Sequence, residues 1–319
     1  MTNDKKTIYI LGHNYTYTDV DSIISSIVLA DMIKRQGYLA EPVIINPDAI
    51  SQNNREIINC IGGLNLPKLK AVKEVINNPI ILVDHNNPLY SYGFFLTETE
   101  PEKPVFKLAA PILCVDHHYD EGFPANNKII DIVGSTCTLL AEMTMVDEKF
   151  ELSDLNAKAL VYGIVSDTKG LKSSAVCERD MNAIYYLYNN YEINVELNKV
   201  IDQVLGVTDD VSKMNVDQIL KNSLKEYCNG NIGIAVIEVS NDDYTEKIKE
   251  IKERAVYTKY PLYILMILKH HTDETLIYYF DKKGIFPDEE RISGLLSRSQ
   301  DVLPHVLIRM FYENYLNQN

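Results

Sequence analysis

Short apolar runs alternate with helical patterns through the first half of the chain. Four runs are apolar, at most four residues long and followed by polar residues, as in buried parallel strands: Ile8–Leu11, Val43–Ile45, Ile80–Val83 and Ile112–Val115. Five other segments carry apolar residues near helical spacing: Asp21–Gln36, Ser51–Ile61, Gly134–Met145, Ser153–Ile164 and Glu178–Asn190. This alternation predicts an α/β fold with a parallel sheet, whose ligands bind beyond the carboxyl ends of the strands.

The pattern changes after about residue 190. Residues 191–208 are polar and irregularly patterned, and we interpret them as a linker between a domain at 1–190 and a second domain at 209–319. Three later runs predict strands and one segment between the first two predicts a helix: Ile232–Val239, Leu262–Leu268, Thr275–Phe280 and Asp242–Tyr257. A short polar turn separates the last two strands, which predicts an antiparallel hairpin. The second domain is therefore expected to be smaller and of the α+β class.

Composition and charge narrow the class of protein. Hydrophobic residues make up 46% and charged residues 24% of the 319 residues, as in ordinary globular proteins. The formal net charge of −14 argues against nonspecific binding to nucleic acid or to an anionic membrane surface. It does not exclude a polyanionic substrate, because bound divalent cations would reverse the local field.

Cysteine usage and hydropathy favour a cytoplasmic location. The five cysteines include no CxxC pair, which suits reduced thiols better than a disulfide framework. No apolar run approaches the roughly 18 residues of a membrane span, and the polar N-terminus does not resemble a signal peptide.

Acidic residues and histidines follow several of the predicted strands in the first domain. They fall in five segments: Gly12-His13 with Asp19–Ser22, Val83–Asn86, Val115–His118, Gly134–Thr136 and Ser166–Thr168. The carboxyl ends of parallel strands lie at one edge of a sheet, so most of these side chains are expected to converge. Two divalent ions about 3.5–4 Å apart in such a site polarise a phosphoanhydride and acidify a shared water.

Six residues form the candidate metal-binding set: His13, Asp19, Asp21, Asp84, His117 and Asp167. Carboxylates and imidazoles without a thiolate favour two Mn²⁺ or Co²⁺ ions, with Mg²⁺ also compatible, over structural zinc. Each residue also has an ordinary alternative: Asp21 could cap a helix, and Asp84 could be a turn residue. The convergence of several such residues at one sheet edge favours the metal interpretation.

The same segments resemble motifs of the DHH phosphoesterase superfamily. They are most similar to family II inorganic pyrophosphatases, which combine a DHH domain with a DHHA2 domain. Asp116-His117-His118 matches the naming motif, and Gly134–Thr138 resembles the GSTAT segment. Ser166–Thr168, followed by Lys172-Ser173, resembles the SDT…FKS segment. The resemblance implies that the six candidates hold the metals, that Asp84 bridges them, and that the chain forms a homodimer.

The resemblance also implies a set of substrate-binding residues, part of which is altered here. His118 is expected to contact the substrate. The family's SRKKQ segment appears as Ser297–Asp301, in which Arg298 keeps its phosphate-binding guanidinium but Ser299 replaces a lysine. Lys225 is the best match to another phosphate-binding lysine, and the alternative is a solvated charge on a helix. The first motif also departs from the family form GHxxPDxDS.

Two extra residues separate His13 from Asp19, and the motif's proline is absent. We therefore expect a longer loop, Asn14–Thr18, that folds outward while His13 and Asp19 converge on one ion. The sequence as a whole predicts metal-dependent hydrolysis of pyrophosphate to two phosphates. Two alternatives stay open: an exopolyphosphatase or other DHH phosphoesterase, and a non-catalytic sensor of a phosphate ligand.

The replacement of a lysine by Ser299 generates a testable prediction. Losing one lysine–phosphate contact should cost about 1.5–3 kcal/mol, or roughly ten- to a hundredfold in rate. Ser299→Lys should therefore raise kcat/KM for pyrophosphate at saturating Mn²⁺, and Arg298→Ala should lower it. If neither substitution changes kcat/KM by about threefold, this segment does not contact the substrate.

Overall fold

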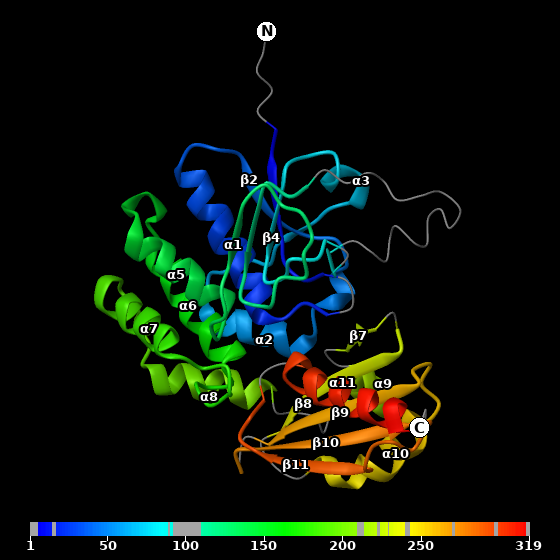
Figure 1. Cartoon of the computed structure of the whole chain (residues 1–319). Coiled ribbons are helices and arrows are strands. Elements are labelled where there is room, and N and C mark those ends of the chain that lie inside the picture. The colour runs from blue at the N-terminus through cyan, green and yellow to red at the C-terminus, as the bar shows by residue number, and fades with distance from the viewer. Residues whose placement is uncertain are drawn as a thin grey trace. The chain divides into compact units, whose positions relative to one another are not determined.

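The computed structural model describes the chain in these ranges: 6–14, 17–88, 90–91, 110–208, 214–221, 224–228, 230–239, 243–269, 272–296 and 299–316. The chain divides into two compact units. The first comprises Met1–Gly170 and Val176–Val204, and the second comprises Leu171–Ala175 and Leu205–Asn319. Each unit has its own sheet, and Figure 1 shows both.

The first unit is built on a six-stranded sheet with the order β3-β2-β1-β4-β5-β6. All five pairings between neighbouring strands are parallel. The strands are β1 (Ile8–Leu11), β2 (Ala40–Ile44), β3 (Lys68–Leu69), β4 (Ile80–Val83), β5 (Leu113–Asp116) and β6 (Lys128–Ile130). The direction of strand order reverses between β1 and β4, so the edge beyond these two strands is the topological switch point where such folds bind ligands.

Helices cover both faces of this sheet. In the described part of this region, the α-helices are α1 (Val20–Arg35), α2 (Gln52–Ile61), α3 (Val72–Val75), α5 (Thr136–Val146), α6 (Asp154–Asp167), α7 (Glu178–Asn190) and α8 (Leu197–Thr208), which continues into the second unit. The 3₁₀ turns η1 (Pro47–Ala49) and η2 (Glu148–Phe150) lie between them. Helices α1, α5 and α6 pack together (Figure 1). On the other face, Tyr9 and Leu11 of β1 pack with Val75 of α3.

The second unit has a mixed five-stranded sheet in the order β11-β10-β9-β8-β7. Its strands are β7 (Lys225–Tyr227), β8 (Ile232–Val239), β9 (Leu262–Lys269), β10 (Glu274–Asp281) and β11 (Glu289–Ser293). Strands β8 and β9 are parallel, whereas the other pairings are antiparallel. The predicted hairpin is confirmed, because β9 pairs with β10 from Leu262↔Asp281 to Lys269↔Glu274.

Two layers of helix enclose the second sheet. Its helices are η4 (Asp243–Lys247), α9 (Val216–Lys221), α10 (Ile248–Ala255) and α11 (Ser299–Leu316). Alternate residues of β9 enter different cores: Leu265 packs in the core of α9 and α10, and Ile264 packs in the core that includes Val302 of α11. Burial on both faces explains why β9 is apolar throughout rather than alternating.

The predicted fold class is confirmed, and the elements that differ from prediction have physical reasons. Strands β3 and β6 were not predicted, because these short edge strands are largely exposed and lack an apolar run. Helix α8 occupies most of the stretch interpreted as an irregular linker. Its apolar residues recur at helical spacing, and Val200 and Val204, one turn apart, are buried. The predicted domain limits at 190 and 209 stay predictions.

None of the described helices is long and apolar enough to cross a membrane.

The packing of α6 on α5 generates a stability prediction. A Cβ at Gly163 would overlap the Sγ of Cys137 and would lie 3.6 Å from Asp21 Oδ1. Gly163→Ala should therefore lower the free energy of unfolding by about 1–3 kcal/mol, measured by urea denaturation. The double variant Gly163→Ala/Cys137→Ala should recover part of that loss, because the overlapping sulfur is gone.

Gly206 in α8 provides the matched control, since a Cβ there would meet nothing within 4 Å. Gly206→Ala should stabilise the helix by about 0.5–1 kcal/mol. Equal changes in the free energy of unfolding for Gly163→Ala and Gly206→Ala would contradict the packing argument.

Candidate metal centre

The predicted site residues gather beyond the carboxyl ends of three adjacent strands. His13 follows β1, Asp84 follows β4 directly, and Asp116 ends β5, just before His117 and His118. Strand β4 lies between β1 and β5 in the sheet, so these residues share one edge at the switch point.

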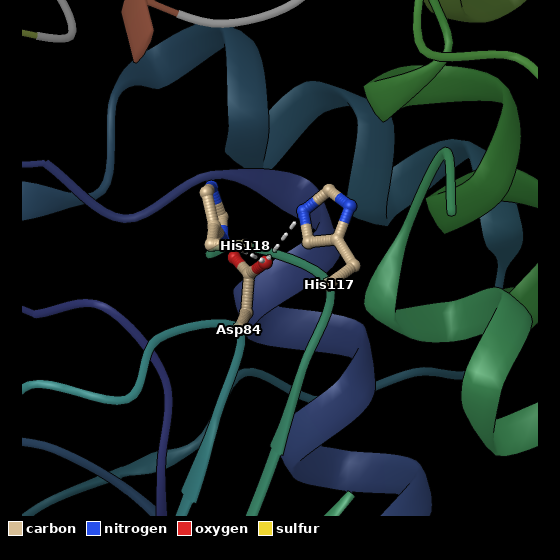
Figure 2. A group of neighbouring side chains, drawn as sticks. All are labelled: Asp84, His117 and His118. Atoms are coloured by element: carbon tan, nitrogen blue, oxygen red, sulfur yellow. Dashed lines mark ion pairs between the residues drawn. The ribbon is translucent and has the colours of Figure 1, made fainter. Parts of the chain in front are cut away.

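Asp84, His117 and His118 form one group of potential metal ligands. Their side chains point toward one another from the ends of β4 and β5, as Figure 2 shows. His117 Nε2 lies 3.2 Å from Asp84 Oδ1, and His118 Nδ1 lies 3.9 Å from the same oxygen. Asp84 and His117 are almost completely buried.

Asp21, His117 and Asp167 form a second group that shares His117 with the first. Asp21 lies in the first turn of α1, and Asp167 is the last residue of α6. His117 Nε2 lies 3.2 Å from Asp167 Oδ2 and 3.9 Å from Asp21 Oδ2. One imidazole nitrogen thus faces carboxylates from three different parts of the chain.

A backbone contact fixes which nitrogen of His117 carries the proton. The Nδ1 atom lies 3.1 Å from the carbonyl oxygen of Val133. A carbonyl oxygen only accepts hydrogen bonds, so Nδ1 is the donor in this contact. In the neutral imidazole, Nε2 then presents its lone pair to the three carboxylates, which is the arrangement of a metal-ligating histidine with a supporting carbonyl.

The electrostatics of the carboxylates also fit a bound cation. Burial raises the pKa of Asp21, and the neighbouring Asp84 and Asp167 raise it further. The pKa of Asp84 is likewise raised, first by burial and then by Asp19 and Asp167. A divalent cation among these oxygens would offset both the desolvation and the repulsion. The set of oxygen and imidazole donors without a thiolate fits Mn²⁺, Co²⁺ or Mg²⁺.

Hydroxyl groups hold the side chain of Asp84 in place. Ser22 Oγ donates a 2.5 Å hydrogen bond to Asp84 Oδ2, and Thr136 Oγ1 donates one of 3.3 Å to Oδ1. The backbone of Asp84 has a φ of 63°, in the left-handed region, which aspartate and asparagine adopt more readily than most other non-glycine residues.

The amino end of α5 holds Asp21. Asp21 Oδ1 accepts hydrogen bonds from Ser135 Oγ at 2.8 Å and from the Cys137 amide at 3.0 Å. Asp21 Oδ2 accepts from the Thr136 amide at 2.7 Å. The first turn of a helix carries partial positive charge, so α5 stabilises this buried carboxylate. The segment Gly134–Thr136 therefore contributes to the site by donating hydrogen bonds to Asp21, a predicted metal ligand.

Asp116 holds His118 and is itself held by Asn86. Asp116 Oδ1 accepts from the His118 amide at 3.1 Å and contacts His118 Nδ1 at 2.8 Å. Asn86 Nδ2 donates a 2.6 Å hydrogen bond to Asp116 Oδ2. Burial alone would raise the pKa of Asp116, but the charges of His118 and His117 and the hydrogen bonds from His118 lower it below its usual range.

His13 and Asp19 are placed differently from the other four candidates. Within the described part of the chain, neither metal-ligand group includes them. Asp19 is the N-cap of α1 and accepts a 2.8 Å hydrogen bond from the Ser22 amide. The capping alternative considered for Asp21 therefore applies to Asp19, and Asp21 lies within the first turn of the helix. His13 is buried, with its ring stacked on Tyr90.

The expectation that Asn14–Thr18 folds outward is wrong at both ends of the loop. Asn14 and Thr18 are buried. The side-chain oxygen of Asn14 accepts hydrogen bonds from the amides of Ile45 and Asn46 at 3.3 and 3.2 Å. These amides follow β2, so they draw Asn14 inward. Residues 15 and 16 lie outside the described residues.

The predicted phosphate-binding residues are described only in part. Arg298 lies outside the described residues, and Ser299 begins α11. Lys225 lies in β7, so the alternative of a helix charge is wrong. Its predicted contact with substrate stays a prediction, as do the roles of the six candidate ligands.

The repulsion among the carboxylates generates a prediction about the metal-free protein. Asp84→Asn keeps the side-chain size and suits the positive φ, but removes one buried charge. Without metal it should raise the unfolding temperature, because the desolvated charge is gone. A change on the order of 1 kcal/mol moves the midpoint by about 2–4 °C in a domain of this size.

With Mn²⁺ present, the wild type should have the higher unfolding temperature, because Mn²⁺ binding to the folded state would stabilise the wild type more than Asp84→Asn. Differential scanning calorimetry with chelator and with Mn²⁺ gives both comparisons. A variant that unfolds at a lower temperature in both conditions would contradict the electrostatic argument.

Comparisons with known proteins agree with this geometry. Residues 7–164 match the DHH family, N-terminal domain. The chain is 28% identical over 251 residues to a probable manganese-dependent inorganic pyrophosphatase of Brevibacillus brevis, covering 76% of this chain and 73% of that one. It is 26% identical over 252 residues to the manganese-dependent inorganic pyrophosphatase of Bacillus subtilis, covering 77% and 74%.

A solved structure from Methanococcus jannaschii, described as that of a family II inorganic pyrophosphatase, has the same fold. It superposes with a TM-score of 0.76 over 93% of this chain and 97% of that one, at 23% sequence identity. The motifs, the parallel sheet and the family match agree that residues 7–164 form the N-terminal domain of the DHH family.

Proposed function

We propose that the chain hydrolyses inorganic pyrophosphate to two phosphates with the help of two divalent metal ions. The observation that carries this proposal is the position of His117 Nε2, which faces Asp84 and Asp167 at 3.2 Å and Asp21 at 3.9 Å. The chain is a hydrolase of the DHH family, and relatives aligned over about three quarters of it are manganese-dependent inorganic pyrophosphatases.

Asp84 is proposed to bridge the two ions, because its Oδ1 belongs to a group with both histidines while its Oδ2 is oriented by Ser22. Asp21, His117 and Asp167 would complete the shells, together with His13 and Asp19. Bound at this position, the ions would supply Lewis acidity and a nucleophilic water near neutral pH. The names of the relatives favour Mn²⁺, and the donor set is equally suitable for Co²⁺.

His118 is proposed to contact the phosphoryl group. Its Nδ1–H donates to Asp116, which remains ionised because its pKa is lowered by the charges and hydrogen bonds of the neighbouring histidines despite burial. Because Nδ1–H faces Asp116, the ring is oriented so that Nε2 is the nitrogen that would face a phosphate oxygen. Arg298 and Lys225 are proposed to neutralise the substrate and the leaving phosphate.

Two further properties are proposed from outside the site. A cytoplasmic location is consistent with the cysteines, since Cys60, Cys114, Cys137, Cys177 and Cys228 are free thiols. A homodimer is proposed from the family resemblance alone.

The proposal is tested by measuring phosphate release from three substrates: pyrophosphate, a short polyphosphate and a nucleotide. Each is assayed with Mn²⁺, Co²⁺ or Mg²⁺ after chelator treatment. We expect kcat/KM to be highest for pyrophosphate with Mn²⁺ or Co²⁺. A higher kcat/KM for polyphosphate than for pyrophosphate would indicate that the chain is an exopolyphosphatase with the same metal centre.

Asp84→Asn supplies the mechanistic control for that assay. Removal of the bridging carboxylate should lower kcat for pyrophosphate by about a hundredfold or more, in line with the loss of 2.7 kcal/mol of transition-state stabilisation. Near-normal turnover with two bound ions would refute the bridging role.

A further inference from the structure

The loop between His13 and Asp19 is anchored to α2 by one buried asparagine. Asn54 Nδ2 donates a 2.8 Å hydrogen bond to the Thr18 carbonyl and one of 3.3 Å to Tyr17 Oη. Asn54 and Thr18 are both buried, and the Thr18 amide donates to the Ala49 carbonyl at 2.9 Å. The loop therefore approaches Asp19 along a fixed path, although it has two residues more than the family motif.

The anchored turn presents a carbonyl oxygen to His13. His13 Nδ1 lies 2.6 Å from the carbonyl oxygen of Tyr17. Because this oxygen can only accept, Nδ1 is the donor, and in the neutral ring Nε2 keeps the lone pair that a metal ligand needs. The ring of Tyr90 stacks on the imidazole with a centroid distance of 5.0 Å and an interplanar angle of 24°. These two contacts restrict the rotation of the ring.

A serine joins His13 to the carboxylate cluster. The His13 amide donates to Ser22 Oγ at 3.1 Å, and Ser22 Oγ donates to Asp84 Oδ2 at 2.5 Å. Only one hydroxyl group separates the backbone of His13 from the proposed bridging ligand. A displacement of Tyr17 and Thr18 that moves His13 would therefore also affect the hydrogen bond from Ser22 to Asp84.

We infer that Asn54 is a positioning residue for His13: it holds the Tyr17–Thr18 turn, and the Tyr17 carbonyl sets the tautomer and orientation of the imidazole. This inference rests on the proposed metal-dependent function. The inference also explains how the longer loop can still position His13, because Asn54 on α2 holds the end of the loop in place. Partners that orient a metal-bound histidine from outside the coordination sphere typically affect metal affinity by about 10–100-fold.

The test compares Asn54→Ala with Asn59→Ala, an exposed position on the same helix. Manganese affinity is measured by isothermal titration calorimetry on the full chain. Pulsed EPR of the Mn²⁺ protein, labelled with ¹⁵N-histidine, measures the hyperfine coupling between the metal and each coordinating histidine nitrogen. The coupling that is lost in His13→Ala is that of His13, and it is called the His13 coupling below.

Asn54→Ala should weaken Mn²⁺ binding by about tenfold or more and reduce the His13 coupling while leaving that of His117. Asn59→Ala should change neither measurement. Tyr17→Phe should have a smaller effect than Asn54→Ala, because it removes the phenolic oxygen and keeps the carbonyl that contacts His13. Thermal unfolding establishes that each variant is folded.

Asn54→Leu provides a second route if Asn54→Ala fails to fold, because leucine fills the buried space but cannot donate to the Thr18 carbonyl. Folded Asn54→Leu should also reduce the His13 coupling. A normal His13 coupling in either folded variant would overturn the inference, even if Mn²⁺ affinity falls, because the role of Asn54 would then be structural only.

The same measurements separate this inference from the proposed function. A wild type that hydrolyses pyrophosphate but has no His13-dependent coupling would overturn the inference and leave the proposed function intact. A wild type that shows the coupling, loses it in Asn54→Ala and does not hydrolyse pyrophosphate would support the inference and refute the proposed substrate. No Mn²⁺ binding by the wild type would overturn both.

Discussion

The site depends on holding several buried carboxylates around one imidazole nitrogen. Asp21, Asp84 and Asp167 surround His117 Nε2, and their proximity, with burial, raises the pKa values of Asp21 and Asp84. Such a cluster would be unfavourable without compensation. The protein supplies part of it through donors from Ser22 and from the amino end of α5. A divalent cation would supply the remainder, which would couple folding of this edge to metal binding.

The topology of the first unit explains how distant residues reach this cluster. Strands β1, β4 and β5 end at one edge, while α1 and α5 begin close enough for Asp21 to accept a hydrogen bond from the Thr136 amide, 115 residues away in sequence. The positive ends of helices stabilise carboxylates, so the fold places favourable electrostatic potential where negative charge accumulates. The acidic net charge of the chain is therefore compatible with a polyanionic substrate once cations are bound.

Sequence patterns predicted the central elements because burial determines both their composition and their place. Strands β1 and β4 and helix α7 lie at the predicted residues, and Asp84 and His117 were identifiable because polar residues follow apolar strands at the functional edge. The edge strands β3 and β6 escaped prediction because they need no apolar run. The segment that contains Ser135 was identified, but the carboxylate that accepts its hydrogen bond was not, since a serine at a helix N-cap has the same local pattern whether or not a remote carboxylate accepts from it. The inward path at Asn14 depends on amides that follow β2, which no local pattern indicates.

The proposed metal ligands and the proposed phosphate-binding residues are under different physical constraints. The six candidate ligands are all present, although the loop between His13 and Asp19 is longer than in the resembled family, whereas Ser299 stands where the resembled segment has a lysine. Removing one ligand leaves the other buried carboxylates without full compensation, and it changes the stability of the folded chain as well as the chemistry. Replacing a lysine by Ser299 removes a favourable contact but buries no uncompensated charge. Under the proposed function, folding and catalysis together restrict the segments that contain Asp84 and Asp167, whereas substrate recognition alone restricts the segment around Ser299. Metal binding and the choice among phosphate substrates would then be separable properties, and a change in the second would require no change in the first.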